Sequence, residues 1–409
     1  MPGQRISQVE FVAMMAILVA TIALAVDAML PAMAQIAAEL SPDNPNRAQL
    51  IVTSFIFGMG IGTLFAGPLS DRFGRKPVIV AGGAIYILGA LLAWQAQTLE
   101  MAIYARVIQG LGAAGPRIVT LAIVRDLYAG REMARLMSFV MIIFTLIPAF
   151  APTIGALLIS WAGWRAVFLM FVVFCLASTL WMHLRLPEPL PVEHRRPLTL
   201  GALKRGTAEI MTNRAVVIGI AAQSFVAAML FSVLSSTQQV FDQAFDHGAT
   251  FHLWFGFIAL VAGTSGFLNS ALVLKLGMRF LVTLTLLVQV GLSSVAVILM
   301  QMPLGETLHF SIFVIWQIGV FFQTGMCLGN LNALAMEPVG HIAGLAASVI
   351  GAVSTVISVA LAVPVGLAFD GTPTPLILGV LVFASIGTIL MVFLRRAEMR
   401  DTQAKDAAA

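Results

Sequence analysis

The stretch GPLSDRFGRKP, residues 67–77, carries the most specific pattern in the chain. Gly67 and Pro68 are expected to end a helix, because proline lacks the backbone N–H that continues a helical hydrogen-bond ladder. A tight cationic turn is expected next, with Gly74 free to adopt a positive φ. Asp71 is a single acid among bases, and an acid in a loop stabilises the N-terminal end of a neighbouring helix. An ordinary basic loop would explain the cations but not this order of glycine, proline and acid.

Long apolar runs flank this stretch on both sides. Of the 409 residues, 59% are hydrophobic and 10% are charged, and the mean hydropathy is +0.96. A soluble domain carries roughly 25% charged residues. About 20 mostly apolar residues cross a bilayer as a helix, and these runs are too long for barrel strands. We therefore predict an all-α membrane protein with twelve spans, at 9–33, 48–69, 78–98, 101–124, 135–160, 164–184, 214–240, 251–274, 278–300, 308–334, 342–369 and 374–395.

The runs form two groups of six, separated by a Pro-rich and charged segment. We interpret this segment as a cytoplasmic linker that holds either a short surface helix near 199–211 or a disordered connector. The first run is too long for the apolar core of a signal peptide, so we interpret it as an uncleaved first helix. The predicted domains are an N-terminal half at 1–184, the linker at 185–213, a C-terminal half at 214–396 and a cytoplasmic tail at 397–409.

The distribution of Lys and Arg predicts the orientation of the chain. With the N-terminus placed in the cytoplasm, all but four of the 23 basic residues fall in cytoplasmic segments. Arg47 and Arg165 are then at the outer face, and Arg106 and Arg117 lie inside a span. Both termini are therefore expected in the cytoplasm.

The two groups of runs also echo one another in sequence. LSDRFGRK at 69–76 lies between spans 2 and 3, and LKLGMR at 274–279 lies between spans 8 and 9. An internal duplication of this kind is typical of transporters whose site lies at the interface of the repeats. Lys275, Gly277 and Arg279 line up with Arg72, Gly74 and Lys76.

The order of residues in 67–77 closely resembles the loop motif of the major facilitator superfamily, and the resemblance covers the whole chain. It implies two pseudo-symmetric six-helix halves that carry a substrate across a bacterial inner membrane by alternating access. It also implies that this loop latches the cytoplasmic gate, with Asp71 facing the start of helix 11 and Arg75 paired with Asp126 at the end of helix 4. The gate residues implied are Gly67, Asp71, Arg72, Gly74, Arg75, Lys76 and Asp126.

The fourth span contains two arginines, and an arginine inside a span is costly and usually functional. The spacing of Arg106, Gly110, Ala113 and Arg117 puts them on one helical face. RVIQGLGAA, which begins at Arg106 and includes Gln109, resembles the family's helix 4 motif, whose arginine is linked to proton transfer. The alternative for Arg106 is a side chain that extends to the outer membrane surface.

The first span contains one acid, Asp27, in the apolar run LVATIALAVDAMLPAM. Asp27 is expected at the same depth as Arg106, and in this fold helices 1 and 4 line the cavity of the N-terminal half. We therefore expect the two side chains to approach each other. Burial disfavours a charged carboxylate and a nearby cation favours it, so substrate or a proton would shift this balance. The alternative is an acid solvated at the outer mouth.

The fifth span contains Pro148, Pro152 and Gly155, which are expected to break or bend the helix. Their spacing resembles the antiporter motif of drug-exporting members, with Ala151 and Ala156 in place of two glycines. Together with the motifs of helices 1 and 4, the pattern most resembles the bicyclomycin/chloramphenicol-resistance branch of drug/proton antiporters. A bend needed only for packing is the alternative.

The second half is less informative. Its spans hold several amides, of which Gln223 is the candidate for substrate binding. No acid lies deep in its spans, so proton traffic is expected in the first half. Gly58 and Gly62 in the second span predict close helix packing.

Several functional classes lack their residues in this sequence. It has no P-loop, no Cys/His cluster and no nucleophile–base–acid set, so we expect no direct ATP use, no metal, no cofactor and no enzyme. The basic residues lie in short loops, which argues against nucleic acid. The expected partners are a small-molecule substrate, protons and the lipid bilayer, and the chain is expected to be monomeric.

These observations support one leading hypothesis and two alternatives. The leading one is proton-coupled export of small amphipathic organic molecules. The second is proton-coupled uptake of a small organic anion or metabolite, held by the two arginines of helix 4. The third is a membrane protein without transport activity, against which the intact gate motif argues.

Overall fold

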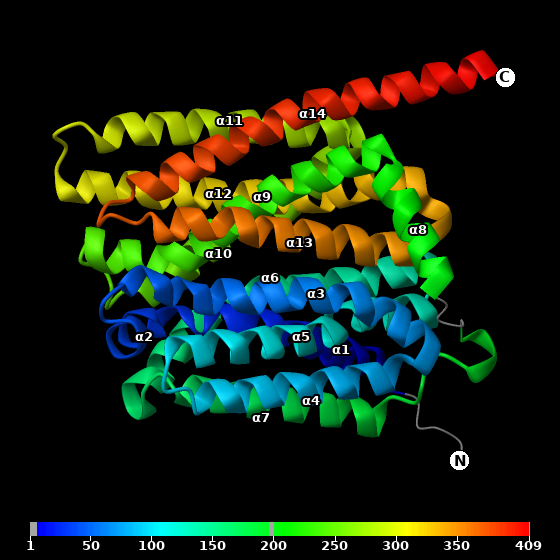
Figure 1. Cartoon of the computed structure of the whole chain (residues 1–409), viewed down its shortest axis with the longest axis horizontal. Coiled ribbons are helices and arrows are strands. Elements are labelled where there is room, and N and C mark those ends of the chain that lie inside the picture. Colours follow the sequence, from blue (N-terminus) through cyan, green and yellow to red (C-terminus); the bar gives the residue numbers. More distant parts are fainter. Residues whose placement is uncertain (1–5, 196–199, 409) are drawn as a thin grey trace. The chain divides into compact units, whose positions relative to one another are not determined.

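The computed structural model describes residues 6–195 and 200–408, and no strand occurs among them. The chain divides into two compact units, Met1–Thr199 and Leu200–Ala409. The boundary falls inside the segment expected to be the linker. Figure 1 shows long helices in both units, as the apolar runs predict.

The helices of the first unit are α1 Gln8–Asp27, η1 Leu30–Ala32, α2 Met33–Leu40, η2 Pro45–Gln49, α3 Leu50–Phe73, α4 Arg75–Trp94, α5 Leu99–Leu127, α6 Gly130–Ala162, α7 Ala166–Arg185 and η3 Val192–His194. Those of the second unit are α8 Leu200–Thr212, α9 Arg214–Gln239, η4 Val240–Ala244, α10 Phe251–Leu276, α11 Met278–Met300, α12 Glu306–Met336, η5 Glu337–Ile342, α13 Ala343–Leu367 and α14 Thr374–Ala408.

Eleven stretches of the described chain are long and apolar enough to cross a membrane. One of them, Glu306–Leu367, has 62 residues and consists of α12, η5 and α13. Because 62 residues contain two helices of spanning length, this stretch accounts for the difference from the predicted twelve. The exact number of spans stays a prediction.

Glycines bring α5 into backbone contact with its two neighbours, α3 and α4. A Cβ on Gly58 of α3 would meet the Val107 carbonyl of α5, and one on Gly62 would lie 2.6 Å from the Leu111 carbonyl. On the other side, a Cβ on Gly89 of α4 would meet the backbone of Gln109. The close packing predicted for Gly58 and Gly62 is therefore confirmed. It holds the polar side chains of α5 at fixed positions inside the first unit.

The pattern of helix contacts in the first unit recurs in the second. In the first, α5 packs on α3 and α4, α4 packs on α7, and α1 packs on α5, α6 and α7. In the second, α12 packs on α10 and α11, α11 packs on α14, and α9 packs on α12, α13 and α14. Each contact of one unit has its counterpart at the same place in the order of long helices, so the internal repeat read from the sequence extends to the packing.

The prediction that Gly67 and Pro68 end the second span is wrong. The helix α3 continues through Pro68 to Phe73 and ends at Gly74, which has φ 104°. Proline removes one hydrogen bond from a helix interior, and the rest of the ladder carries the helix on. The positive φ predicted for Gly74 is confirmed, and this glycine terminates the helix.

Three other elements refine the sequence prediction. Of the two alternatives for the linker, the short helix is the one present, as α8, Leu200–Thr212. The last helix extends past the predicted span to Ala408, because Ala, Arg, Glu, Lys and Gln are strong helix formers. The fifth span, α6, is continuous through Pro148 and Pro152, so a break there is excluded and the bend stays a prediction.

Candidate functional site

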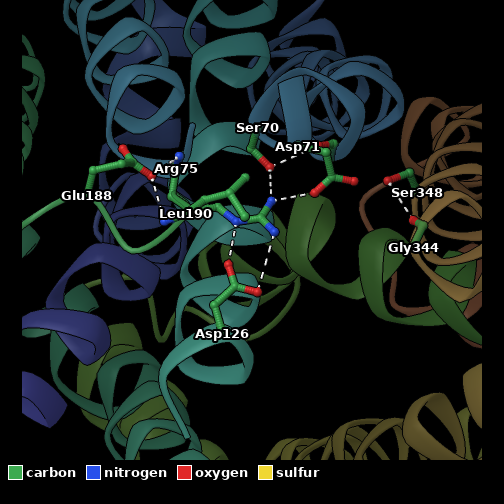
Figure 2. A network of polar contacts seen from close by, with 9 residues as sticks. Ser70, Asp71, Arg75, Asp126, Glu188, Leu190, Gly344 and Ser348 are labelled. Carbon is green, nitrogen blue, oxygen red and sulfur yellow. Dashed lines mark hydrogen bonds and ion pairs between the residues drawn. The ribbon is translucent and has the colours of Figure 1, made fainter. Parts of the chain in front are cut away.

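Arg75 is the centre of a polar network at the junction of α3 and α4. Its side chain is buried and bonds to two acids: Nε lies 2.7 Å from Asp126 Oδ2 and Nη1 lies 2.6 Å from Asp71 Oδ1. Nη1 also donates to the hydroxyl of Ser70 at 2.7 Å. Figure 2 shows the guanidinium between these groups. The predicted pairing of Arg75 with Asp126 is confirmed, whereas the position of Asp71 relative to helix 11 stays a prediction.

Glu188, from the segment after α7, caps the first turn of α4. Its carboxylate accepts the backbone N–H of Arg75 at 2.7 Å and that of Lys76 at 3.0 Å. A helix N-terminus has unpaired N–H groups and a partial positive charge, so an anion is stabilising there. Pro187 and Pro189 flank Glu188 and restrict its backbone. Glu188 therefore performs the helix-end role that the sequence suggested for Asp71, and it joins the linker to this loop.

The remaining gate candidates lie around the same junction. The Gly67 carbonyl accepts a hydrogen bond from Ser70 at 2.8 Å. The Arg72 guanidinium lies 5.3 Å from the centre of the Phe73 ring. Lys76 Nζ donates to the His183 carbonyl of α7 at 2.9 Å. With the bonds of Arg75 to Ser70 and Asp71, the Lys76 contact joins α3, α4 and α7 at the end of the unit that the charge pattern predicts to be cytoplasmic.

Asp27 lies where helix 1 changes its hydrogen bonding. It is the last residue of α1, and Pro31 has no N–H to donate to the Asp27 carbonyl one turn earlier. Met29 donates to Val26 at 3.3 Å instead of to Ala25, and a 3₁₀ turn follows. The Asp27 side chain is 4% exposed, and within residues 6–195 and 200–408 it accepts no hydrogen bond and joins no ion pair. An unpaired carboxylate at this depth is costly in its charged form.

Arg106 is fully buried and joins α5 to two other helices. Its Nη2 donates to the Ala25 carbonyl of α1 at 3.0 Å, and its Nε donates to the Ile51 carbonyl of α3 at 3.1 Å. The third contact is from Nη1 to Gln109 Oε1 at 2.7 Å. The ring of Phe55 lies 4.3 Å from the guanidinium carbon, a distance typical of a cation–π contact. The outer-surface alternative for Arg106 is therefore excluded.

Arg106 approaches helix 1 as expected, but it bonds to the backbone of that helix and not to the Asp27 side chain. Arg106 reaches helix 1 at the Ala25 carbonyl, and no ion pair joins its guanidinium to the Asp27 carboxylate. The reason is the change of hydrogen bonding after Asp27, because Ala25 loses its helical partner Met29 and its free carbonyl attracts the cation. Arg106 thus contacts helix 1 two residues before Asp27 without neutralising its carboxylate.

Two further polar groups beside Arg106 are buried. Among the residues that the structure describes, the amide nitrogen of Gln109 and the hydroxyl of Tyr86 have no hydrogen-bond partner, and both side chains are at most 1% exposed. Tyr86 of α4 packs edge-on against Phe55, with 6.4 Å between ring centres. Buried polar groups are almost always paired, so these two groups provide unused hydrogen-bonding capacity beside Arg106.

The other predicted site residues lie outside this cluster. Arg117 is partly buried, and its one recorded contact in the described chain is Nη1 to Met59 Sδ at 3.7 Å. In the second unit, the amide oxygen of Gln223 is buried and has no hydrogen-bond partner within residues 6–195 and 200–408. Gly155 of α6 lies against the Ala28 carbonyl, where any Cβ would collide, so this part of α6 packs directly beside the Asp27 junction.

The sequence reading missed Glu188, Tyr86 and Phe55. Glu188 had a usable signal, because an acid between two prolines just after a helix is held rigidly near the membrane surface. Tyr86 and Phe55 had none, because an aromatic residue in an apolar span is ordinary. Only the packing of α3, α4 and α5 shows that both rings lie beside Arg106.

The sequence pattern of the Major Facilitator Superfamily matches residues 15–364. The chain belongs to this family. A bicyclomycin resistance protein homolog from Haemophilus influenzae is 29% identical over 332 residues, 80% of this chain and 81% of that protein. A chloramphenicol resistance protein from Pseudomonas aeruginosa is 38% identical over 121 residues, 29% of each chain. Both relatives have names that belong to the branch which the motifs of helices 1, 4 and 5 resemble.

A solved structure agrees on the fold. The crystal structure of a D-xylose-proton symporter superposes with a TM-score of 0.74 at 14% sequence identity, covering 95% of this chain and 97% of that one. At this identity the likeness establishes the Major Facilitator fold alone.

Proposed function

We propose that this chain is a proton-coupled secondary transporter that exports small amphipathic organic molecules by alternating access, with Asp27 as the proton-binding group. The observation that carries the proposal is the carboxylate of Asp27. It is buried, pairs with no cation among the described residues, and lies where helix 1 changes its hydrogen bonding. Ionisable groups inside membrane spans are functional by default. Drug export is supported by relatives named for bicyclomycin, chloramphenicol and multidrug resistance.

The surroundings of this carboxylate allow it to bind either a proton or a substrate, and they include Arg106, Gln109 and Tyr86. An unpaired charged carboxylate is costly in apolar surroundings, so Asp27 is stabilised either by a proton or by a polar substrate that reaches it. The unpaired amide of Gln109 and hydroxyl of Tyr86 offer hydrogen bonds to such a substrate. Proton and substrate would then compete for one region, which is the requirement for exchange.

The proposed setting is a bacterial inner membrane with both termini in the cytoplasm, a monomeric chain and no catalytic activity. The charge pattern supports this orientation. The Arg75 network would latch the cytoplasmic end, with Asp71 and Asp126 as its acids.

Asp27→Asn tests the proposal. Asparagine keeps the shape and cannot lose or gain the proton, so accumulation of a fluorescent amphipathic dye in everted vesicles under an imposed pH gradient is expected to fall to background. Asp43→Asn, which changes an exposed acid in a loop, is the control and is expected to transport as the wild type does. Normal transport by Asp27→Asn with an unchanged pH dependence would refute the assignment.

Arg117 supports a second candidate, the uptake of a small organic anion with protons. It is a partly buried cation with no ion pair to an acid in the part of the chain that the structure describes. An anionic substrate would neutralise it. Cells carrying the wild type, Arg117→Gln or no transporter are compared for dye efflux and for growth on organic anions. Anion-dependent growth that requires Arg117, without dye efflux, would favour uptake over export.

A further inference from the structure

Helix 1 consists of two segments joined just after Asp27. The inner segment is α1, the outer segment is α2, Met33–Leu40, and a 3₁₀ turn that contains Pro31 lies between them. A short 3₁₀ stretch between helical segments often marks a hinge. The contacts that hold α2 therefore affect how Asp27 is covered.

Glu39, in the last turn of α2, ties this outer segment to the turn between α6 and α7. Its Oε2 accepts a hydrogen bond from the indole N–H of Trp164 at 2.7 Å, and its Oε1 pairs with Arg165 Nη1 at 2.7 Å. Arg165 Nη2 also donates to the Ala96 carbonyl at 2.9 Å. Trp164 is 4% exposed, so the partner of Glu39 is anchored in the packed interior rather than free at the surface.

Packed side chains lead from this ion pair back to Asp27. The Trp164 ring meets Phe168 edge-on with 6.0 Å between centres. The centre of the Phe168 ring lies 6.0 Å from the guanidinium carbon of Arg106. Arg106 in turn holds the Ala25 carbonyl, two positions before Asp27. The contacts of Glu39 at the outer end and of Arg106 at Ala25 thus belong to one contiguous set, and packed sets of this kind carry energetic coupling between sites.

We propose that Glu39 is a positioning residue for Asp27. Through Trp164 and Arg165 it holds the outer segment of helix 1 against the rest of the unit and keeps Asp27 away from water. When this contact opens, α2 moves about the 3₁₀ turn, and Asp27 exchanges its proton with the outer side. The role rests on the proposed function, in which Asp27 binds the proton.

The inner end of the same helix provides a matched control. Glu10 lies 2.6 Å from Arg185 Nε and 2.9 Å from its Nη2, and it accepts from Trp181 Nε1 at 3.4 Å. The same set of carboxylate, tryptophan and arginine thus joins helix 1 to the other end of α7. Uninterrupted α-helix separates Glu10 from Asp27. Loss of the Glu10 contacts therefore reports any general destabilisation of the unit without releasing α2.

The test measures how readily Asp27 reacts from water. Full-length protein in lipid nanodiscs is treated with a water-soluble carbodiimide and glycinamide, which convert a protonated carboxyl into an amide, and mass spectrometry follows each site. Asp27→Asn identifies the Asp27 peptide. Glu39→Gln and Arg165→Gln are expected to react several-fold faster at Asp27, and Glu10→Gln at the wild-type rate. Equal acceleration by Glu39→Gln and Glu10→Gln, or none by Glu39→Gln, would overturn the proposal.

Hydrogen exchange separates this proposal from the proposed function. Amides 28–36 are expected to exchange several-fold faster in Glu39→Gln than in the wild type or Glu10→Gln, whether or not Asp27 binds the transported proton. Unchanged exchange in Glu39→Gln would refute the positioning role even if Asp27→Asn had abolished transport. Thermal unfolding of each variant confirms that it is folded.

Discussion

At the scale of single residues, the environment of Arg106 differs from that of an arginine held by an acid. Three of its N–H groups go to neutral oxygens, those of Ala25, Ile51 and Gln109. A buried guanidinium with only dipolar partners depends on the geometry of several bonds at once, because no single charge holds it. Its partners lie on α1, α3 and α5, so small shifts of these helices act on the cation directly.

Arg106→Lys tests this dependence. A lysine ammonium cannot reproduce the planar set of donors, so at least one buried carbonyl loses its partner, at a cost of about 1–3 kcal/mol in the free energy of unfolding. The midpoint of thermal unfolding in detergent measures the loss. Arg125→Lys, an exposed change on the same helix, is the control and is expected to leave the midpoint unchanged. Equal midpoints for both variants would contradict the role of Arg106.

Gly74→Ala and Gly277→Ala form a matched pair. Both glycines join two helices with positive φ, 104° and 79°, and an alanine costs about 1–3 kcal/mol at such positions. A Cβ on Gly74 would also lie 3.0 Å from the Glu188 carboxylate, whereas a Cβ on Gly277 would meet no atom of the described residues within 4 Å. Gly74→Ala is therefore expected to lower the unfolding midpoint more. A larger loss for Gly277→Ala would show that Glu188 does not crowd this position.

At the scale of elements, helix ends and glycine contacts position the site. The start of α4 is capped from the linker by Glu188, and α5 is fixed between α3 and α4 by backbone contacts at Gly58 and Gly89. Side chains contribute little volume at these contacts, so the helices approach closely. The polar face of α5 is then held against helix 1 with little freedom to adjust.

Glu188→Ala tests the cap of α4. The variant leaves two backbone N–H groups at the helix start without their acceptor, so the free energy of unfolding is expected to fall by about 0.5–2 kcal/mol. Faster amide exchange at residues 75–79 is the direct measurement. Glu193→Ala changes an exposed acid in the same segment and is expected to have no effect there. Identical exchange in the two variants would argue against the cap.

At the scale of the whole molecule, the two units share a packing pattern but differ in the polar junction between their second and third long helices. In the first unit, Arg75 is buried between Asp71 and Asp126 at 2.6 and 2.7 Å. In the second unit, Arg279 and Glu337 lie 3.6 Å apart and are both exposed. Exposed pairs contribute little energy, whereas removal of one partner from a buried pair leaves an uncompensated charge and is strongly destabilising. The junction of the first unit is therefore expected to be the more sensitive of the two to mutation. In the second copy of the motif, LKLGMR at 274–279, Met278 stands at the position of Arg75, which agrees with this difference.

The orientation of the whole chain has its own test. In a background with Cys175→Ser and Cys327→Ser, single cysteines replace Arg47 and Lys204. A membrane-impermeant thiol reagent is expected to label the Arg47→Cys protein in intact cells and the Lys204→Cys protein only in everted vesicles, because the basic residues favour the cytoplasmic side. The opposite pattern would reverse the proposed topology.

The sequence by itself determined the helical class, the family, the order of the long helices and the pair Arg75–Asp126. These features depend on properties that are local or repeated: hydrophobic length, charge asymmetry, and a motif whose residues lie within one loop and one helix end. Gly74 was predictable for the same reason, because its positive φ belongs to its own backbone.

Only the tertiary structure decided what surrounds Asp27 and Arg106. Hydrogen bonding along a helix depends on every donor. Because Met29 donates to Val26 instead of to Ala25 just before Pro31, the Ala25 carbonyl is left to accept from Arg106, which does not pair with Asp27. Hydrogen-bond partners were also what the sequence could not supply at two other places: α3 runs through Pro68, and Glu188 accepts from the start of α4. Partners that are distant in sequence compete for each polar group, and spacing along the chain does not rank them, because the outcome depends on which backbone groups the packing leaves unpaired.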